Sequence, residues 1–251
     1  MSKKQAKSKT KQKNKTEIKF PSGKSWFYKL VRVFMPLIFK KPQIINLAGE
    51  LPDKAIVVVN HSAKSGPPGL DIWYPKTTCK WGTHEMFEGF KSRKAYLRDI
   101  LYIKKCGMKP GAATSFKASV LGFLNPPIYR GMRMIPTYTD ARFSATLRVS
   151  TDVLDQNLSV MIFPENSNEG YKDVLTDFFP GFVMLAQSYF RKTGEDVPVY
   201  PVYYSVKKRI LVIAPPMYVQ DMVKEGLNKF EIAQRYCDAV NKLYYDYVER
   251  A

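Results

Sequence analysis

The chain has 251 residues, 45% of them hydrophobic and 14% aromatic, which is enough for one domain of about 200–250 residues with a real core. This composition excludes a collagen-like, a largely disordered or a disulfide-stapled protein. The formal net charge is +18, and a balance this basic indicates an anionic partner, either nucleic acid or an acidic membrane surface.

The three cysteines, Cys79, Cys106 and Cys237, are scattered along the chain. No pair of them has the spacing of a metal site. An odd number of dispersed thiols is typical of proteins in a reducing compartment, so we expect free thiols in a cytosolic setting. The sequence predicts neither a metal ion nor a cofactor.

Residues 1–24 carry nine lysines against the single acid Glu17, with almost no apolar side chain. Such a segment cannot bury enough surface to fold, so we expect a disordered polybasic tail. Two interpretations are open. The tail is either a solubilising arm or an electrostatic tether to anionic lipid, and the apolar segment that follows favours the tether.

Residues 25–47 contain the sequence WFYKLVRVFMPLIFKKPQIINL. Two basic residues, Lys29 and Arg32, interrupt the apolar run, and Pro36 is expected to break the helical pattern. The longest uncharged stretch, residues 33–39, is far shorter than the ~20 residues that a membrane span needs. Aromatic side chains beside basic ones are typical of a helix in the membrane interface. We therefore expect a peripheral or monotopic protein on the cytoplasmic face of a membrane; the alternative is a first helix packed on the domain's own core.

An α/β pattern begins after residue 48. The apolar, β-branched run at residues 55–59 predicts a buried strand. Further strands are predicted at residues 158–163, 197–204 and 209–214, and helices at residues 92–105, 142–156, 182–191 and 230–248. Alternating strands and helices predict one α/β domain over residues 48–251, with a mixed, mostly covered β-sheet flanked by helices.

The chain has two histidines. His61 follows the strand at residues 55–59 directly, where a buried strand meets a loop rich in glycine and proline. Catalytic residues of α/β folds often occupy such strand ends. An imidazole at this place is able to take a proton from an attacking hydroxyl, although a loop histidine on its own is more often structural. For His84, which is followed by Glu85, we favour a structural role.

Four short blocks resemble those of the lysophosphatidate acyltransferase-like family. Residues 60–62, Asn-His-Ser, resemble its N-H-x-S opening, and residues 163–167, Phe-Pro-Glu-Asn-Ser, resemble its F-P-E-G-[ST] block. Residues 131–136, GMRMIP, are similar to its middle block, and residues 197–202, VPVYPV, to its late strand. All four occur in the family's order over residues 55–214.

The resemblance implies a glycerolipid acyltransferase-like fold and the transfer of a fatty acyl group from acyl-CoA or acyl carrier protein to a hydroxyl of a lipid-like acceptor. It implies that His61 is the general base and that no metal is needed. It places the following residues in the substrate site: Ser62, Lys64, Gly131, Arg133, Pro164, Glu165, Asn166 and Ser167.

The sequence departs from the family five residues after His61, where the family has a carboxylate that orients the histidine ring. This chain has Gly66 there. We take Asp71, ten residues after His61, as the candidate catalytic partner, provided that the loop folds back; the alternative is that Asp71 caps the next segment. Glu165, or a serine hydroxyl from Ser62 or Ser65, is a further possible partner for the ring.

A second departure concerns the two arginines that the family uses for the acceptor's phosphate. Thr139 and Asn168 stand in their places. Arg130, Arg133 and Arg142 lie near the first gap and are the candidates to replace them. Because neither a hydroxyl nor an amide matches arginine's charged, forked contact with phosphate, we expect an acceptor that is held differently.

Three functions stay under consideration. The first is an acyltransferase that acts at an anionic membrane surface. The second is a weak or inactive lipid-binding relative with the same fold, which the missing carboxylate favours. The third is a nucleic-acid-binding protein, suggested by the lysine tail; because the folded part shows no nucleic-acid module, we do not expect a nucleic-acid partner.

Overall fold

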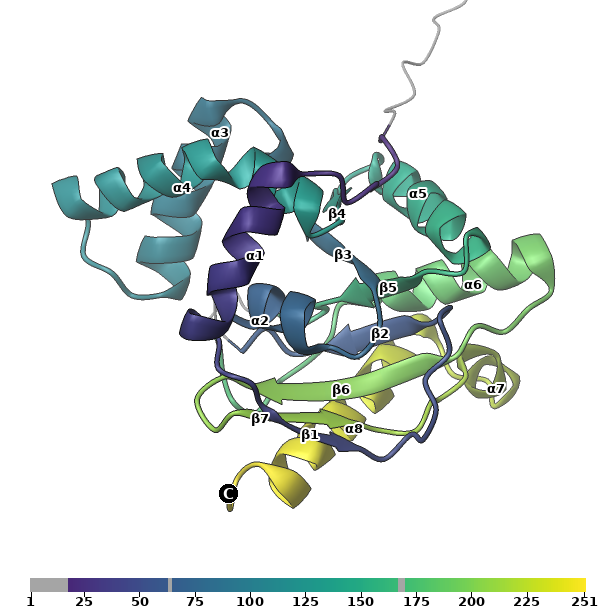
Figure 1. Ribbon diagram of the computed structural model, residues 1–251. Helices are drawn as coiled ribbons and strands as arrows, with labels where there is room; N and C mark the ends of the chain where they lie inside the picture. Colours follow the sequence, from purple (N-terminus) through teal and green to yellow (C-terminus); the bar gives the residue numbers. More distant parts are fainter. Residues whose placement is uncertain (1–17, 63–64, 167–169) are drawn as a thin grey trace, which may run out of the picture.

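A seven-stranded sheet forms the centre of the computed structural model, which describes residues 18–62, 65–166 and 170–251 (Figure 1). The strand order is β1-β7-β6-β2-β5-β3-β4, and β6 with β7 is the antiparallel pair, whereas the other neighbours run parallel. The strands are β1 (Gln43–Asn46), β2 (Ile56–Val59), β3 (Thr78–Thr83), β4 (Met134–Thr137), β5 (Ser159–Ile162), β6 (Val199–Ser205) and β7 (Ile210–Ile213).

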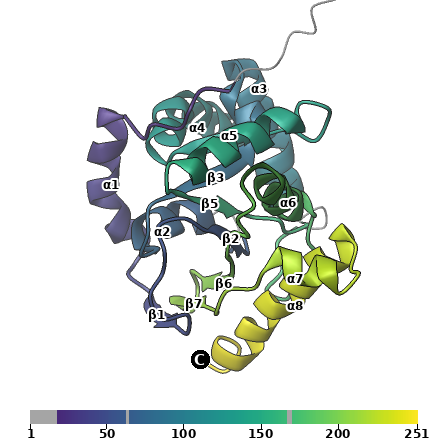
Figure 2. The same cartoon turned by 90° about the vertical axis from the view of Figure 1, so that its right-hand side faces the viewer.

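Helices cover both faces of this sheet. Figure 2 shows α1 and α2 on one side and α5, α6, α7 and α8 on the other. The helices are α1 (Trp26–Ile38), α2 (Gly66–Trp73), α3 (Phe90–Ala95), α4 (Ala112–Gly131), α5 (Phe143–Asp155), α6 (Gly181–Thr193), α7 (Val219–Lys224) and α8 (Lys229–Tyr247), with a 3₁₀ helix, η2 (His84–Phe87), and a π-helix, η3 (Tyr96–Lys105).

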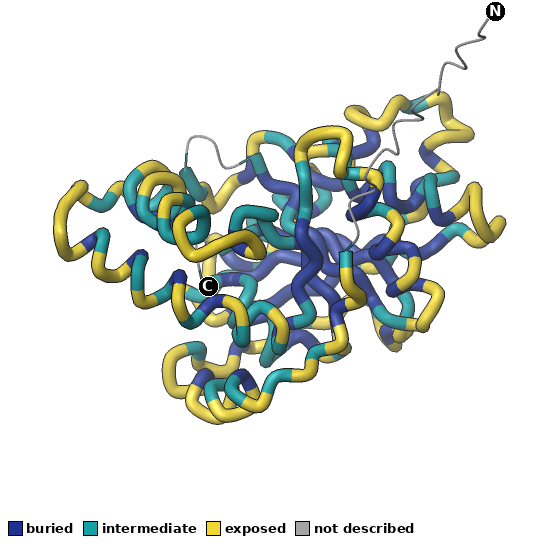
Figure 3. The backbone as a smooth tube through the Cα atoms, turned by 90° about the horizontal axis from the view of Figure 1, so that it is seen from above, coloured by how far each residue is buried: buried dark blue, intermediate teal, exposed yellow. Residues whose placement is uncertain are grey.

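The strands read as continuous apolar runs because their two faces are both buried. All four residues of β2 and all four of β5 are buried, as expected for central parallel strands under helices. One face packs against Phe182 and Leu185 of α6 and Tyr236 of α8, and the other against Leu70 of α2. Figure 3 shows the buried centre surrounded by an exposed periphery.

The predicted fold class, a mixed and mostly covered sheet flanked by helices, is confirmed. The predicted strands, and the helices predicted at residues 142–156, 182–191 and 230–248, are found with boundaries that shift by a few residues. In α6, for example, the helix ends at Thr193 and Gly194 follows it in the left-handed conformation that favours glycine. The helix predicted at residues 92–105 divides into the end of α3 and the π-helix η3.

The predicted segment at residues 25–47 contains two different elements. Its first part forms α1, which continues past Pro36 to Ile38. Pro36 removes one hydrogen bond of the helix, and the ladder resumes after it, since the backbone N–H of Phe39 donates to the Met35 carbonyl at 2.7 Å. The expected break at Pro36 is therefore wrong. Its last part forms β1, which pairs with β7 at the edge of the sheet. Among the described residues, no helix is long and apolar enough to cross a membrane.

A buried ionic cluster joins α1, α2 and β3. The Asp71 carboxylate of α2 accepts a hydrogen bond from the Tyr28 hydroxyl of α1, and its other oxygen lies 2.5 Å from Lys80 Nζ of β3. The Lys80 side chain is only 1% exposed. A buried ammonium needs a carboxylate close by, since desolvating an unpaired charge is costly. The cluster therefore fixes α1 and α2 against the sheet.

We predict that Asp71→Asn lowers the free energy of unfolding by about 3–5 kcal/mol, because it leaves the Lys80 ammonium buried without its counter-charge. Urea denaturation followed by circular dichroism measures the loss. The matched control is Asp53→Asn, which removes the exposed pair of Asp53 with Lys76 and is expected to cost less than about 1 kcal/mol. Equal costs for the two variants would contradict the structural role of the cluster.

Candidate active site

His61 follows the carboxyl end of β2, beside the carboxyl end of its parallel neighbour β5. The side chains of Asn60 and Ser62, the residues on either side of His61, bond to the backbone of β6 and the residue after it, beyond the point where the backbone pairing of β2 with β6 ends. The Asn60 amide donates to the backbone carbonyl of Tyr204 at 3.0 Å and accepts from its N–H at 2.8 Å. Ser62 Oγ accepts from the backbone N–H of Val206 at 3.1 Å. These side-chain contacts hold both ends of the turn, so the position of His61 between them is fixed.

Glu165 ties the end of β5 to His61. Its carboxylate accepts the backbone N–H of His61 at 2.9 Å. The segment around Glu165 is itself held by a bridge to Phe178 and by the backbone N–H of Phe179, which donates to the carbonyl of Pro164 at 2.8 Å. Glu165 thus fixes the backbone of the histidine, whereas we had considered it for the ring or for the acceptor.

The His61 ring lies between two aromatic side chains. It stacks on Phe163, with ring centroids 4.8 Å apart, and contacts Tyr171 at 5.2 Å. Its buried Nδ1 has no hydrogen-bond partner among the described residues. A buried ring nitrogen without a partner costs free energy, and this nitrogen is available to a polar group of a ligand.

The surroundings keep the imidazole neutral. Burial, reinforced by the positive charge of Lys105, lowers the pKa of His61 to about 3. The neutral ring, the form that accepts a proton, is therefore fully populated at neutral pH.

Lys105 and Glu165 place opposite charges beside the ring. The Lys105 ammonium lies 5.5 Å from the Tyr171 ring centroid, and it acts on both Glu165 and His61. Burial raises the pKa of Glu165, which the nearby N–H groups and Lys105 partly offset. Burial also lowers the pKa of Lys105. The site therefore combines a neutral base with a cation in partly dry surroundings.

The structure does not bring Asp71 to the His61 ring, which corrects the expected catalytic pair. The two carboxylate oxygens of Asp71 are occupied by Tyr28 and Lys80. The reason is that α2 starts at Gly66 and carries Asp71 away towards α1 and β3. Asp71 is a residue of the buried ionic cluster.

Gly66 shows why no carboxylate stands five residues after His61. A Cβ atom added to Gly66 would lie 1.9 Å from the carbonyl oxygen of His61. The backbones of the two residues are packed against each other, so a side chain at position 66 would have to displace the histidine.

The structure separates Gly131 and Arg133 from His61, so they are not beside the candidate base, and their expected part in substrate binding stays a prediction. Arg133 precedes β4 and, through the pairing of β3 with β4 and β5, is level with Ile56 of β2. His61 is five residues further along, which corresponds to roughly 16 Å in the strand direction. Gly131 packs under Tyr28 of α1, where an added Cβ would lie 2.1 Å from that side chain.

The remaining candidates divide into three groups. Pro164 and Ser62 make the structural contacts given above. The side chain of Asn166 donates to the Asp177 carboxylate at 3.1 Å and so stabilises the loop after β5. Lys64 and Ser167 lie outside the described residues, as does Asn168. Arg142 follows β4 at the carboxyl edge, but its guanidinium is paired with Asp140 and lies over Tyr138.

Sequence reasoning missed three residues around the ring. Phe163 opens the Phe-Pro-Glu-Asn-Ser block at residues 163–167, and its place directly after a predicted strand indicates a residue close to the site. Lys105 ends a predicted helix, but nothing in the sequence relates that helix to His61. Tyr171 lies in a loop without any pattern, so no sequence signal points to it.

The low pKa of His61 makes stability depend on pH. The unfolded chain binds a proton at His61 near pH 6.5, whereas the folded chain does so only near pH 3, so the unfolded state binds more protons between these values. Stability from this residue is complete above pH 6.5 and is lost as the pH falls towards 3, by at most about 1.4 kcal/mol per pH unit. We predict that His61→Gln flattens this part of the curve of unfolding free energy against pH. Parallel curves for the two proteins would contradict the burial of a neutral imidazole.

Comparison with known proteins gives one kind of similarity. No family model and no curated protein matches the sequence. Among solved structures, the fold is similar to that of the 1-acyl-sn-glycerophosphate (LPA) acyltransferase PlsC from Thermotoga maritima, with a TM-score of 0.50 and 17% identity over 86% of this chain and 77% of that chain. The chain therefore has the fold of an LPA acyltransferase. An identity of 17% shows a similarity of fold alone.

Proposed function

We propose that this protein transfers a fatty acyl group from a thioester carrier to a hydroxyl of a lipid-like acceptor, with His61 as the general base. The observation that carries the proposal is a buried imidazole at the end of β2 whose Nδ1 has no partner among the described residues, in a chain whose fold is similar to that of an acyltransferase. The carboxyl edge of a sheet is where α/β folds bind their substrates.

The proposed reaction exchanges a thioester for an ester. The imidazole nitrogen takes the proton of the acceptor hydroxyl while its oxygen bonds to the thioester carbonyl carbon. The tetrahedral oxyanion then collapses, the carbon–sulfur bond breaks, and the imidazolium returns the proton to the leaving thiolate. The products are an ester and a free thiol. Acyl-CoA and acyl carrier protein both supply such a thioester.

Lys105 and Glu165 have complementary parts in this scheme. The Lys105 ammonium supplies positive charge near the developing oxyanion, and such charge is most effective in a site from which water is excluded. The Glu165 carboxylate holds the backbone of His61. Since Thr139 and Asn168 carry no charge, Lys105 is also the described cation best placed to meet a phosphate on the acceptor.

We predict that His61→Ala abolishes the release of free thiol from acyl-CoA or acyl carrier protein in the presence of a mixture of lipid acceptors. General-base catalysis is worth ~10²–10⁴ in rate, so the loss should be at least of this order. Thiol release and mass spectrometry of the acylated lipid measure it. His84→Ala is the matched control and should retain activity, because His84 is held by Glu85 and Glu88 instead.

Two results would decide between the proposals. Full turnover in the His61→Ala variant would refute the role of His61. A wild-type protein that binds lipid but releases no thiol from either donor would support the alternative of an inactive relative, for which the missing carboxylate at Gly66 is the observation in favour.

We also propose that α1 attaches the protein to an anionic membrane. One face of α1 packs on the core through Tyr28 and Met35, while its other face exposes a set of large apolar side chains: Trp26, Leu30, Val33, Phe34, Leu37 and Ile38. Exposed apolar patches of this kind mark sites of interaction. The Lys29 and Arg32 side chains on the same helix and the lysine tail before it suit an acidic lipid surface.

A second exposed apolar stripe lies on α4, which packs beside α1. It consists of Phe116, Val120 and Phe123, at helical spacing, with Phe123 74% exposed. Two adjacent helices with exposed apolar stripes provide more insertable surface than one.

We predict that replacing Leu30 and Val33 by serine strongly reduces sedimentation with vesicles that contain anionic lipid, because it removes apolar surface worth about 25 cal/mol per Å². The matched control replaces Val174 and Tyr218 by serine, two exposed side chains outside α1 and α4, and should bind as the wild type does. Equal binding by both variants would contradict attachment through α1.

A further inference from the structure

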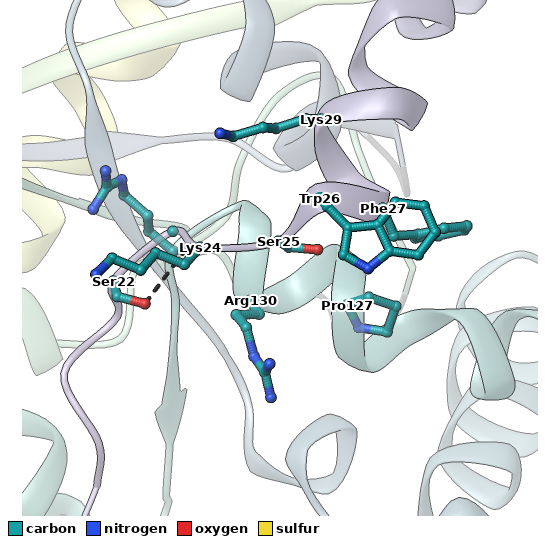
Figure 4. Close-up of a pocket in the computed structure, with 10 residues that line it drawn as sticks. Ser22, Lys24, Ser25, Trp26, Phe27, Lys29, Pro127 and Arg130 are labelled. Carbon is teal, nitrogen blue, oxygen red and sulfur yellow. Dashed lines mark hydrogen bonds between the residues drawn. The ribbon is translucent and has the colours of Figure 1, made fainter.

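A hollow of about 620 Å³ lies between the start of α1 and the end of α4, away from His61. Figure 4 shows side chains from the segment that leads into α1 and from the start of that helix, among them Lys24, Trp26 and Lys29, together with Pro127 and Arg130 from the end of α4. Its lining consists of Ser22, Gly23, Lys24, Ser25, Trp26, Phe27, Lys29, Pro127, Arg130 and Arg133.

The charge of this hollow is entirely positive. Four cationic side chains line it, Lys24, Lys29, Arg130 and Arg133, and its lining contains no acid. Within the described part of the chain, none of the four forms a salt bridge; the Arg133 guanidinium donates to the backbone carbonyl of Pro21 at 3.3 Å. Like charges gathered without a counter-charge repel one another and attract an anion.

The hollow is not the place where the acceptor reacts. Arg133 stands at the beginning of β4, whereas His61 follows the end of β2, at the opposite edge of a parallel set of strands. A group bound beside Arg133 is separated from the imidazole by the length of a strand, roughly 16 Å. An anion in the hollow is therefore a second ligand.

The apolar surface next to the hollow identifies the kind of anion. Trp26 lines it, is 79% exposed and begins the apolar face of α1. A tryptophan beside cations and an exposed apolar stripe matches the boundary between headgroups and acyl chains of a bilayer. A phosphate with acyl chains attached satisfies the cations and the apolar surface together, whereas free phosphate satisfies the cations alone.

We infer that this hollow binds the phosphate headgroup of an anionic membrane lipid, and so sets the position and rotation of α1 on the bilayer. Arginine and lysine both bind phosphate, arginine through its paired donors. The inference rests on the proposed attachment of α1 to a membrane and adds to it a defined site with a preference for a phosphate-bearing headgroup.

The test uses the full chain and two kinds of phosphatidylcholine vesicle with equal surface charge, one containing phosphatidate and the other cholesteryl hemisuccinate, whose anion is a carboxylate. The variant is Lys24→Gln with Arg130→Gln; both side chains are exposed, so the fold should be unaffected. The matched control, Lys207→Gln with Arg191→Gln, removes the same charge from exposed positions outside the hollow. Sedimentation at one ionic strength measures partitioning.

We expect the wild type and the control to prefer phosphatidate vesicles, and the hollow variant to bind them roughly tenfold or more weakly and to lose the preference. Wild-type binding that does not distinguish the two vesicles, or a hollow variant that behaves as the control does, would overturn the inference while leaving attachment through α1 intact. Release from phosphatidate vesicles by millimolar inorganic phosphate would also overturn it, since the site would then take free phosphate. Failure of the protein to bind any vesicle would refute the membrane attachment together with this site, whereas the role of His61 is tested separately by thiol release.

Discussion

The hydrogen bond from the backbone N–H of His61 to the Glu165 carboxylate connects the ends of β2 and β5, and the candidate site depends on it. Two strands that are far apart in sequence end beside each other because they are parallel neighbours. The chain leaves the sheet at His61, so the backbone N–H of His61 no longer has a partner in a neighbouring strand. The buried Glu165 carboxylate accepts this N–H instead. Asn60 and Ser62 complete the arrangement by pairing with β6. The imidazole is consequently held through its backbone, and its Nδ1, which has no partner among the described residues, stays available to a ligand.

Holding the backbone explains how the site is arranged without a carboxylate on the ring. In a catalytic triad the third group fixes the tautomer and orientation of the histidine and offsets its charge during the reaction. In this chain Phe163 stacks on the His61 ring and Tyr171 contacts it at a tilt, and together they restrict its orientation. The Glu165 carboxylate contacts the backbone N–H of His61 at 2.9 Å, so the position of its negative charge is fixed relative to that residue. The close packing of Gly66 on the His61 carbonyl excludes the usual carboxylate sterically. The absence of an acid after the histidine is thus a consequence of how α2 begins.

The sequence predicted those parts of the molecule that depend on local pattern or on strand order. Apolar runs placed β2, β5, β6 and β7, and the parallel neighbours β2 and β5 brought His61 and Glu165 together as their motifs suggested. The sequence did not predict the positions of Asp71 and Arg133, which depend on the direction in which the chain continues. Asp71 was expected to fold back to His61, but the helix that starts at Gly66 turns it towards Tyr28 and Lys80. Arg133 was expected near the acceptor because its block resembles the family, yet it precedes its strand and therefore lies at the other edge. Spacing along the chain determines neither outcome.

The buried ionic cluster relates α1 to the histidine through a short path of packed groups. Tyr28 belongs to the buried face of α1 and donates to Asp71, which lies one turn and a half along α2 from Gly66; Gly66 in turn rests against the His61 carbonyl. Because α2 is a single short helix, a shift of α1 that pulled on Asp71 would move the carbonyl contact as well. Separating Asp71 from Lys80 would at the same time leave the buried Lys80 ammonium without its counter-charge. This cost opposes independent movement of α1, so α1 and the loop of His61 keep a fixed relation to each other. Under the proposed attachment of α1 to a bilayer, the same path would hold His61 at a fixed place relative to the lipid surface.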